Sequence, residues 1–463
     1  MRLIALVVLL LVSACSAPRI VELPTRGVAL PEKLPEIRHF PPLNMHHPVV
    51  RRSNIDIARD FLDLGFAMES GRALPRLTRF EGPVTVALAR PGGALMTADL
   101  QEVVRRLKTE AGIRISLLPP GSAANIVIET LPRHRLRRAV PQAACFVVPR
   151  VTSWKEFQRS RLGDRLDWSS LDVRKRAAIF IPDDVSPQET RDCLNEELAQ
   201  ALGPLNDLYR LGDSVFNDDN ILSVLTPFDM LVLRIYYSDA LHNGMTRDEV
   251  AARLPRLLRR LNPVGEKIAP RNPSPSPRKW INAIETALGP GASPRMRINA
   301  ARHAVRIADR QQWKGNRLGF SLYVLGRLTL GNDNRTATDA FHRAYKAYAK
   351  AFGTRDIHTA HVALQLAALT LSQGKARAAL SLVNESIPAA MHARNAGLLA
   401  TLLMVKAEAL DALGRSKIAQ RVRLDSIGWA RYGFASTDEI RARLQETAAL
   451  RPAVHKPEPK PEA

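Results

Sequence analysis

Two proline-rich segments divide this chain of 463 residues and limit where regular structure can form. The first runs from Ser16 to about Val50 and the second from Pro263 to Pro277. Because proline fixes its φ angle and has no backbone N–H, both segments are predicted to be extended. We interpret the first as a tether and the second as a linker between two ordered regions. The predicted organisation is a signal peptide over 1–14, a tether over 15–50, an α/β domain over 51–262, a linker over 263–278, a helical domain over 279–450 and a disordered tail over 451–463.

The first residues have the features of an export signal. Arg2 is followed by an apolar run from Leu3 to Val12, which is too short to span a bilayer, since that needs about 20 residues. The run ends in Val12-Ser13-Ala14-Cys15, which resembles the bacterial lipobox. That resemblance implies palmitate-type acyl chains on Cys15 and a cell-envelope location. Because Ser16 and not Asp follows, it favours the outer membrane, facing the periplasm. The alternative is ordinary secretion with an incidental Cys.

Two cysteines remain besides the predicted lipidation site. In an oxidising compartment the pair Cys145 and Cys193 is predicted to form a disulfide. A catalytic cysteine is the alternative, but no histidine lies nearby in the sequence to activate it.

The net charge of +22 predicts attraction to an acidic partner. Export excludes nucleic acid, and few of the basic residues alternate with aromatic ones. Anionic lipid or lipopolysaccharide phosphate fits the predicted location better. The alternative is a diffusely solvated, arginine-rich surface.

The region before the linker is predicted to mix helices and strands. Periodic apolar residues predict helices over 55–68 and 97–111. Stretches rich in β-branched residues predict strands at 84–88, 113–117, 125–131, 145–148 and 177–181. A further helix begins with the capping box Ser186-Pro-Gln-Glu189 and ends at Gly203-Pro204. This order predicts an α/β (α+β) domain with a mixed sheet and helices packed against it.

The region after the linker is predicted to be a helical repeat. Small residues recur in similar contexts at Ala340, Ala379 and Ala419, and Gly374 and Gly414 precede two of those helices. The stretch Leu364 to Leu380 resembles a tetratricopeptide helix pair, and the resemblance covers about residues 295–435. It implies stacked helix pairs that bind proteins or peptides. The alternative is a helical bundle without repeats.

The capped helix is where chemistry is predicted. Glu196 and Gln200 lie four residues apart, on one face, with Glu197 beside them. A zinc protease helix places two histidine ligands at that spacing, with a glutamate after the first as general base.

The segment resembles a degenerate metzincin motif, H-E-x-x-H-x-x-G-x-x-H. The resemblance places Glu196, Gln200 and Asn206 at the ligand positions and Glu197 at the general base. Phe216 stands where the family has the methionine of its Met-turn, and Leu225 to Tyr237 resembles the final helix of matrixins. The order of elements is also that of a zincin fold.

All three histidines of the motif are missing. Zinc prefers imidazole and thiolate, so a carboxylate and two amides predict no tight zinc, although they suit a hard cation such as Ca²⁺. Asp213, Asp218 and Asp219 form either a second cation site or, as we favour, a loop whose side chains cap its own backbone. Histidines such as His134 or His242 meeting Glu197 would overturn this interpretation.

The α/β domain also resembles a proteobacterial lipoprotein family of unknown function, through Glu196 to Asp207 and Asp213 to Asp219. The sequence therefore predicts a membrane-anchored periplasmic lipoprotein with a non-catalytic, metzincin-like domain. Its helical repeats are predicted to bind envelope proteins or peptides, as a scaffold. The alternative is a peptidase or other hydrolase, with or without a metal, in which Glu197 is the general base.

Overall fold

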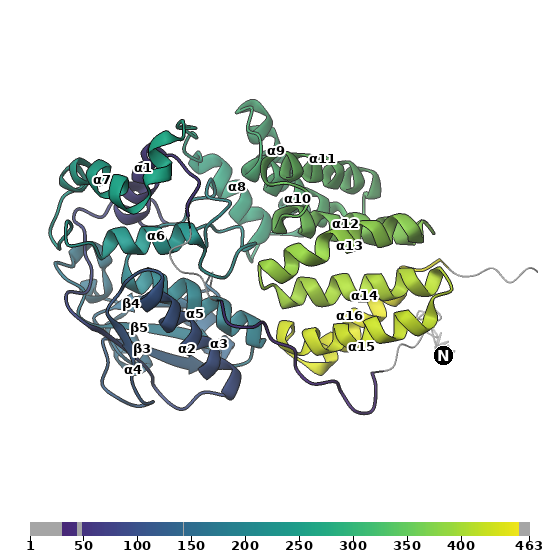
Figure 1. Cartoon of the computed structure of the whole chain (residues 1–463), viewed down its shortest axis with the longest axis horizontal. Coiled ribbons are helices and arrows are strands. Elements are labelled where there is room, and N and C mark those ends of the chain that lie inside the picture. The colour runs from purple at the N-terminus through teal and green to yellow at the C-terminus, as the bar shows by residue number, and fades with distance from the viewer. Residues whose placement is uncertain (1–29, 44–48, 142, 453–463) are drawn as a thin grey trace, which may run out of the picture.

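The computed structural model describes residues 30–43, 49–141 and 143–452. Cys15, the predicted signal peptide and nearly all of the predicted tail lie outside these residues. An α/β region and a stack of helices lie side by side (Figure 1). The predicted fold class is confirmed, because a mixed sheet with helices precedes an all-helical region.

The sheet has five strands in the order β2-β1-β3-β5-β4. The strands β1, β2, β3 and β5 are parallel, and β4 is antiparallel to β5. The bounds are β1 Val84–Leu88, β2 Ile115–Leu117, β3 Ile126–Leu131, β4 Phe146–Pro149 and β5 Ala177–Pro182. Every residue of β5 is buried, as expected for a strand that is covered on both faces.

Helices cover both faces of the sheet. Ile179 and Ile181 of β5 face the larger core, to which α2 and α5 contribute, whereas Phe180 faces a smaller aromatic core with Trp154 and Phe157. The bounds of the helices in this region are α1 Asn54–Gly65, α2 Ala94–Thr109, α3 Arg133–Ala139, α4 Trp154–Ser160, α5 Pro187–Leu202, α6 Pro227–Tyr236 and α7 Arg247–Leu261, with short 3₁₀ turns η1 Asp164–Leu166, η2 Trp168–Ser170 and η3 Pro263–Lys267.

The second region consists of successive antiparallel helix pairs. Its helices are α8 Arg278–Leu288, α9 Pro294–Arg310, α10 Asn316–Thr329, α11 Asn334–Phe352, α12 Ile357–Ser372, α13 Ala376–His392, α14 Ala396–Ala412, α15 Ser416–Gly433 and α16 Thr437–Ala448. Ala340, Ala379 and Ala419 are buried in α11, α13 and α15, so the spacing detected in the sequence corresponds to one helix pair. Gly374 and Gly414 have φ angles of 76° and 74°, which suit glycine in the turns before α13 and α15.

The described part of the predicted tether is packed against the protein. Residues 30–43, dark purple in Figure 1, run along α15 and then reach the α/β region. Arg38 donates its backbone N–H to Gly428 O at 3.0 Å, and the rings of Phe40 and Trp429 lie 4.7 Å apart. Leu43 N–H donates to Glu102 Oε1 at 2.8 Å. We call residues 30–43 the strap. Proline prevented its pairing in a sheet but did not prevent its side chains from packing.

The predicted linker is also fixed in place. Arg271 N–H donates to Asp56 Oδ2 at 2.7 Å, and Arg317 of α10 donates to Ser274 O at 2.9 Å. The segment therefore contacts both regions, because its backbone groups find partners on each side.

The two regions also contact each other directly. At the start of α5, Gly397 N–H donates to Gln188 Oε1 at 2.9 Å, and Arg191 donates to Arg394 O at 2.8 Å. Tyr209, in the loop after α5, packs edge-on against Trp280 of α8, with ring centroids 5.0 Å apart.

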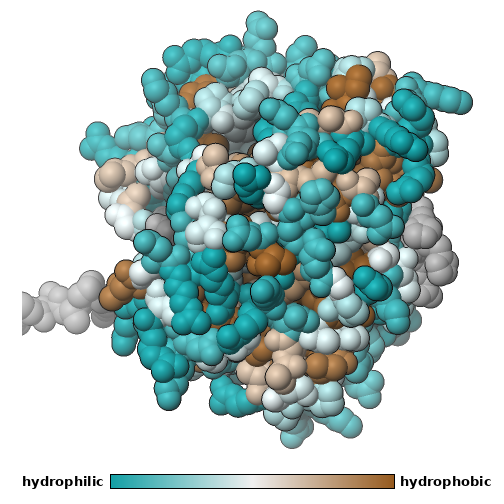
Figure 2. Space-filling model, turned by 90° about the vertical axis from the view of Figure 1, so that its left-hand side faces the viewer, coloured by the Kyte–Doolittle hydropathy of each residue, from teal (hydrophilic) through white to brown (hydrophobic). Residues whose placement is uncertain are grey.

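Hydrophilic side chains cover most of the face formed by the α/β region, and hydrophobic ones appear there in small, separate areas (Figure 2). Among the described residues, no helix has both the length and the apolar character needed to cross a membrane.

Candidate functional site

Helix α5 is positioned by contacts at both of its ends. At the start, Ser186 Oγ accepts from Glu189 N–H at 3.0 Å, and Pro187 occupies the first turn, as the sequence predicted. At the end, the buried guanidinium of Arg174 donates to Gln200 O, Ala201 O and Gly203 O at 2.6–2.8 Å. These bonds satisfy carbonyl groups that the end of a helix leaves without partners.

Glu197, the candidate general base, is buried at the sheet. Its side chain is 3% exposed and accepts a hydrogen bond from Val147 N–H of β4. Its Oε2 has no hydrogen-bond partner among the described residues. Burial raises the pKa of Glu197 well above its ordinary value, and the neighbouring Glu196 and Glu69 add to the shift. The raised pKa disfavours the ionised carboxylate that a general base requires.

Glu196 and Gln200 face a group of further acids. Burial, followed by the charges of Glu69 and Asp218, raises the pKa of Glu196 to about 8. Gln200 Nε2 donates to Glu69 Oε1 at 3.5 Å. The two residues at the predicted first and second ligand positions therefore lie close to the same carboxylate, Glu69.

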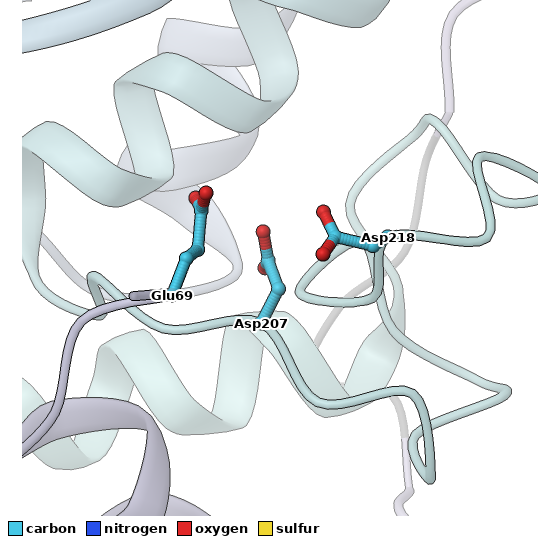
Figure 3. Close-up of side chains that lie close together, drawn as sticks. All are labelled: Glu69, Asp207 and Asp218. Carbon is cyan, nitrogen blue, oxygen red and sulfur yellow. The ribbon is translucent and has the colours of Figure 1, made fainter. Parts of the chain in front are cut away.

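Three carboxylates form the centre of this group. One oxygen each from Glu69, Asp207 and Asp218 lies within 4.8 Å of the others, and the side chain of Asp218 points toward the other two (Figure 3). Burial and the charge of Glu69 raise the pKa of Asp218 to about 7 and hold that of Asp207 well above its usual range. We call Glu69, Asp207 and Asp218 the carboxylate centre.

Asn206, the predicted third ligand, points elsewhere. Its Nδ2 donates to Asp63 O of α1 at 2.8 Å, so its side chain fixes the loop to α1. The next residue, Asp207, supplies the oxygen that joins the centre. The oxygen that faces Glu69 and Asp218 therefore comes from the residue after the one that the motif selected.

The chemistry of the donors does not fit zinc. The centre offers carboxylate oxygens, and Gln200 adds an amide beside it, whereas zinc prefers imidazole and thiolate. In the described part of the chain, no histidine or cysteine joins a group that could hold a metal. His134 and His242 are both exposed, and His242 Nδ1 lies 2.9 Å from Asn243 O. Neither belongs to such a group.

The predicted trio of aspartates does not gather. Asp213 pairs with Arg52, Asp219 accepts from Asn316 Nδ2 at 3.1 Å, and Asp218 belongs to the carboxylate centre. The segment is instead a loop whose side chains bind its own backbone, the interpretation that the sequence favoured. For example, Ile221 N–H donates to Asp219 Oδ1 at 3.1 Å.

Phe216, at the position of the Met-turn methionine, is fully buried in the larger core. The turn is held by the buried Asp229 of α6, which accepts from Ser214 Oγ at 2.5 Å and from Val215 N–H at 3.1 Å. Burial raises the pKa of Asp229 to about 6.

Cys145 and Cys193 form a disulfide, the pairing expected from the sequence. It joins the residue before β4 to α5, with a Cα–Cα distance of 6.0 Å. The bond lies one turn before Glu197 on α5, so it holds that helix close to the strand that binds the Glu197 carboxyl.

Glu69 and Asp207 were missed by the sequence analysis. Glu69 follows α1 in a turn that includes Gly71 at φ 82°, and it lies 131 residues from Gln200. No motif or periodicity links these positions. Asp207 follows Asn206, the residue that the motif selected. Its carboxyl group was the only sign in the sequence that it could belong to an acidic site.

Neither the curated proteins nor the solved structures include a significant match. A family model described as a protein of unknown function, DUF2927, matches residues 54–256, which include the sheet, α5 and the carboxylate centre. The chain therefore carries a DUF2927 domain, of unknown function, over residues 54–256.

Proposed function

We propose that this protein is a lipoprotein of the cell envelope, anchored through Cys15 to the outer membrane and facing the periplasm. Its α/β region is a metzincin-like domain that holds no zinc and performs no catalysis. The helical region binds envelope proteins or peptides, and the whole chain acts as a scaffold.

One observation carries the non-catalytic assignment. At the spacing where a zinc protease needs two imidazoles, α5 presents the carboxyl of Glu196 and the amide of Gln200 beside the carboxylate of Glu69. The position of α5, directly after β5 and against the sheet, agrees with the metzincin-like fold. A set of carboxylates and an amide with no imidazole or thiolate binds zinc more weakly than the histidine-containing sets that lower the pKa of a bound water.

The alternative is a hydrolase in which Glu197 activates water. A general base must be ionised near the working pH and must reach its proton. Glu197 has a strongly raised pKa and is 3% exposed, so it has little support for that role.

A hard cation is the ion that the carboxylate centre would accept. Ca²⁺ binds carboxylate oxygens, and the positive charge would offset the repulsion among Glu69, Asp207 and Asp218. Binding would lower the raised pKa values of these groups, because an ion favours their charged forms.

The scaffold proposal is supported by the arrangement of α8 to α16 in successive pairs. Stacked pairs expose a series of helices along one surface, which suits extended peptide segments. Because the helical region contacts α5, a partner bound to the helices would bind a protein whose two regions are joined.

Metal analysis combined with peptidase assays tests the proposal. The protein is purified without chelators, its zinc and calcium content is measured, and wild type is compared with Glu197→Gln on a mixture of unstructured peptides. We expect zinc far below one ion per chain and no hydrolysis by either form. Stoichiometric zinc together with hydrolysis that the substitution abolishes would overturn the assignment.

Cys15→Ser tests the anchor. In the proposed anchor, the acyl chains on Cys15 attach the protein to the membrane, and serine at this position does not receive them. We therefore expect the variant to leave the membrane fraction. Unchanged retention in the outer membrane would contradict the proposed anchor.

A further inference from the structure

We propose that a cleft between the two regions binds a ligand that carries two or more phosphate groups, either free in solution or on a lipid headgroup. This site lies apart from the carboxylate centre, and the proposal does not depend on whether α5 is catalytic.

The cleft has a volume of about 970 Å³. Its walls come from residues 51–60 at the start of α1, the loop 210–213, the linker residues 268–273, the start of α10 and the end of α11. Elements of both regions therefore form it, and the packed linker makes up one side.

The lining of the cleft is strongly basic. Among the described residues that line it, nine are Lys or Arg and three are Asp. The three aspartates already have cationic partners. Asp60 pairs with Arg52 and Arg210, Asp213 pairs with Arg52, and Asp56 pairs with Arg59 outside the lining.

Most of the remaining cations have no carboxylate partner. Arg343 pairs with Asp309 at 3.1 Å. The others form no ion pair within the described part of the chain, and they are Arg51, Arg271, Lys314, Arg317, Lys346 and Lys350. Six unneutralised cations around one cavity repel one another, and a multivalent anion would relieve that repulsion.

Arg317 is the most buried of the six. Its side chain is held by Ser274 O at 2.9 Å and stacks over the ring of Trp313 at 3.7 Å, and the residue is 8% exposed. Burial, together with the charge of Arg210, lowers the pKa of Arg317 to about 10. A cation that is fixed in place, desolvated and without a counter-charge is suited to receive an anion from the cleft.

The start of α10 adds backbone donors to the same wall. This helix begins at Asn316 after Gly315, which has no side chain to cap the first N–H groups. Lys314, Gly315 and Asn316 all line the cleft. The N–H groups of a helix's first turn and the positive end of the helix dipole favour a compact oxyanion, and lysine and arginine side chains complete a phosphate site.

Pyrophosphate and cardiolipin vesicles are the two probes, since each ligand carries two phosphate groups, and all proteins carry Cys15→Ser so that acylation does not contribute. Binding is measured by calorimetry for pyrophosphate and by co-sedimentation for vesicles, with phosphatidylcholine vesicles as the neutral reference. The test variant is K314Q/K346Q/K350Q, in which all three lysines are exposed.

The matched control is K155Q/K279Q/K417Q, which removes the same charge from exposed positions away from the cleft. A second variant, K314R/K346R/K350R, keeps the charge in the cleft. We expect the cleft variant to bind at least about tenfold more weakly than wild type, while the control and the arginine variant bind as wild type does.

Binding of pyrophosphate that shows this pattern would indicate a soluble ligand. The same pattern with cardiolipin vesicles alone would indicate a lipid headgroup. The proposal is overturned if neither probe binds, or if the control loses as much affinity as the cleft variant. Melting curves for all variants establish that each is folded.

Discussion

Gln200 donates a hydrogen bond through Nε2 to Glu69 Oε1 at 3.5 Å, across 131 residues of sequence. The contact brings the turn after α1 against α5. Glu69 thereby adds its charge beside Glu196, Asp207 and Asp218, whose pKa values are all raised. This concentration of acids makes the stability of the fold depend on pH.

The stability of the protein is predicted to fall as the pH rises from about 4.5 to about 8. Glu196 and Asp218 have pKa values near 8 and 7 in the folded protein, so the folded state binds more protons than the unfolded chain over this range. Glu196→Gln removes one of these groups and should recover about 1–3 kcal/mol at pH 8. Urea unfolding at several pH values measures the effect.

Glu446→Gln, an exposed substitution on α16, is the control for this experiment and should leave the pH dependence as in wild type. If the free energy of unfolding stays constant over the same pH range in calcium-free buffer, the pKa values of Glu196 and Asp218 are not raised in the folded protein. Added Ca²⁺ should raise stability most at the alkaline end, where the carboxylates are charged.

Arg174→Met is predicted to destabilise the protein by about 3 kcal/mol. The arginine supplies hydrogen bonds to three carbonyl groups at the end of α5, and methionine would leave those buried acceptors without donors. Thermal or urea unfolding at pH 7 measures the loss.

Arg176→Met is the comparison for that change. Arg176 pairs with Glu156 on the surface, at 2.9 Å, and exposed pairs contribute less than about 1 kcal/mol. Equal losses for Arg174→Met and Arg176→Met would show that the end of α5 does not depend on the buried guanidinium.

Gly428→Val is predicted to displace the strap from α15. A Cβ at this position would lie 2.9 Å from Arg38 Cγ and 3.1 Å from Glu36 O, so any side chain meets the strap. Limited proteolysis should cut within residues 30–43 faster in the variant, and the fluorescence of Trp429 should change because Phe40 moves away.

Gly93→Ala is the control, since a Cβ there would meet nothing within 4 Å. Its cleavage rate should match that of wild type. If the strap of Gly428→Val is cleaved at the wild-type rate, the strap does not pack against Gly428.

Local sequence signals predicted the regular elements well. The expected strand at 84–88 matches β1, and Ser186 caps the start of α5 as predicted. The Glu189 side chain does not complete the predicted capping box, because it accepts from Arg133 instead. For β1 and for the start of α5, the residues that determine the structure lie next to one another in the sequence. Helices α3, α4 and α7 were not predicted. Helix α3, for example, is mostly basic and buries only Leu136, so it has little periodicity to detect.

The candidate site depended on distant contacts and was predicted only in part. Helical spacing placed Glu196 beside Gln200, but Glu69 joins them through the course of a turn far away in the sequence. Asn206 and Asp207 were confused because the direction of each side chain is set by the loop, and specifically by the bond from Asn206 to α1.

The strap links the earliest described residues of the chain to one of the last helices. Phe40 finds its partner, Trp429, only after almost the whole polypeptide has been synthesised. During translation, residues 30–43 therefore cannot pack in this way until α15 has been made. A nascent chain truncated before α15 would lack the helix surface against which the strap packs.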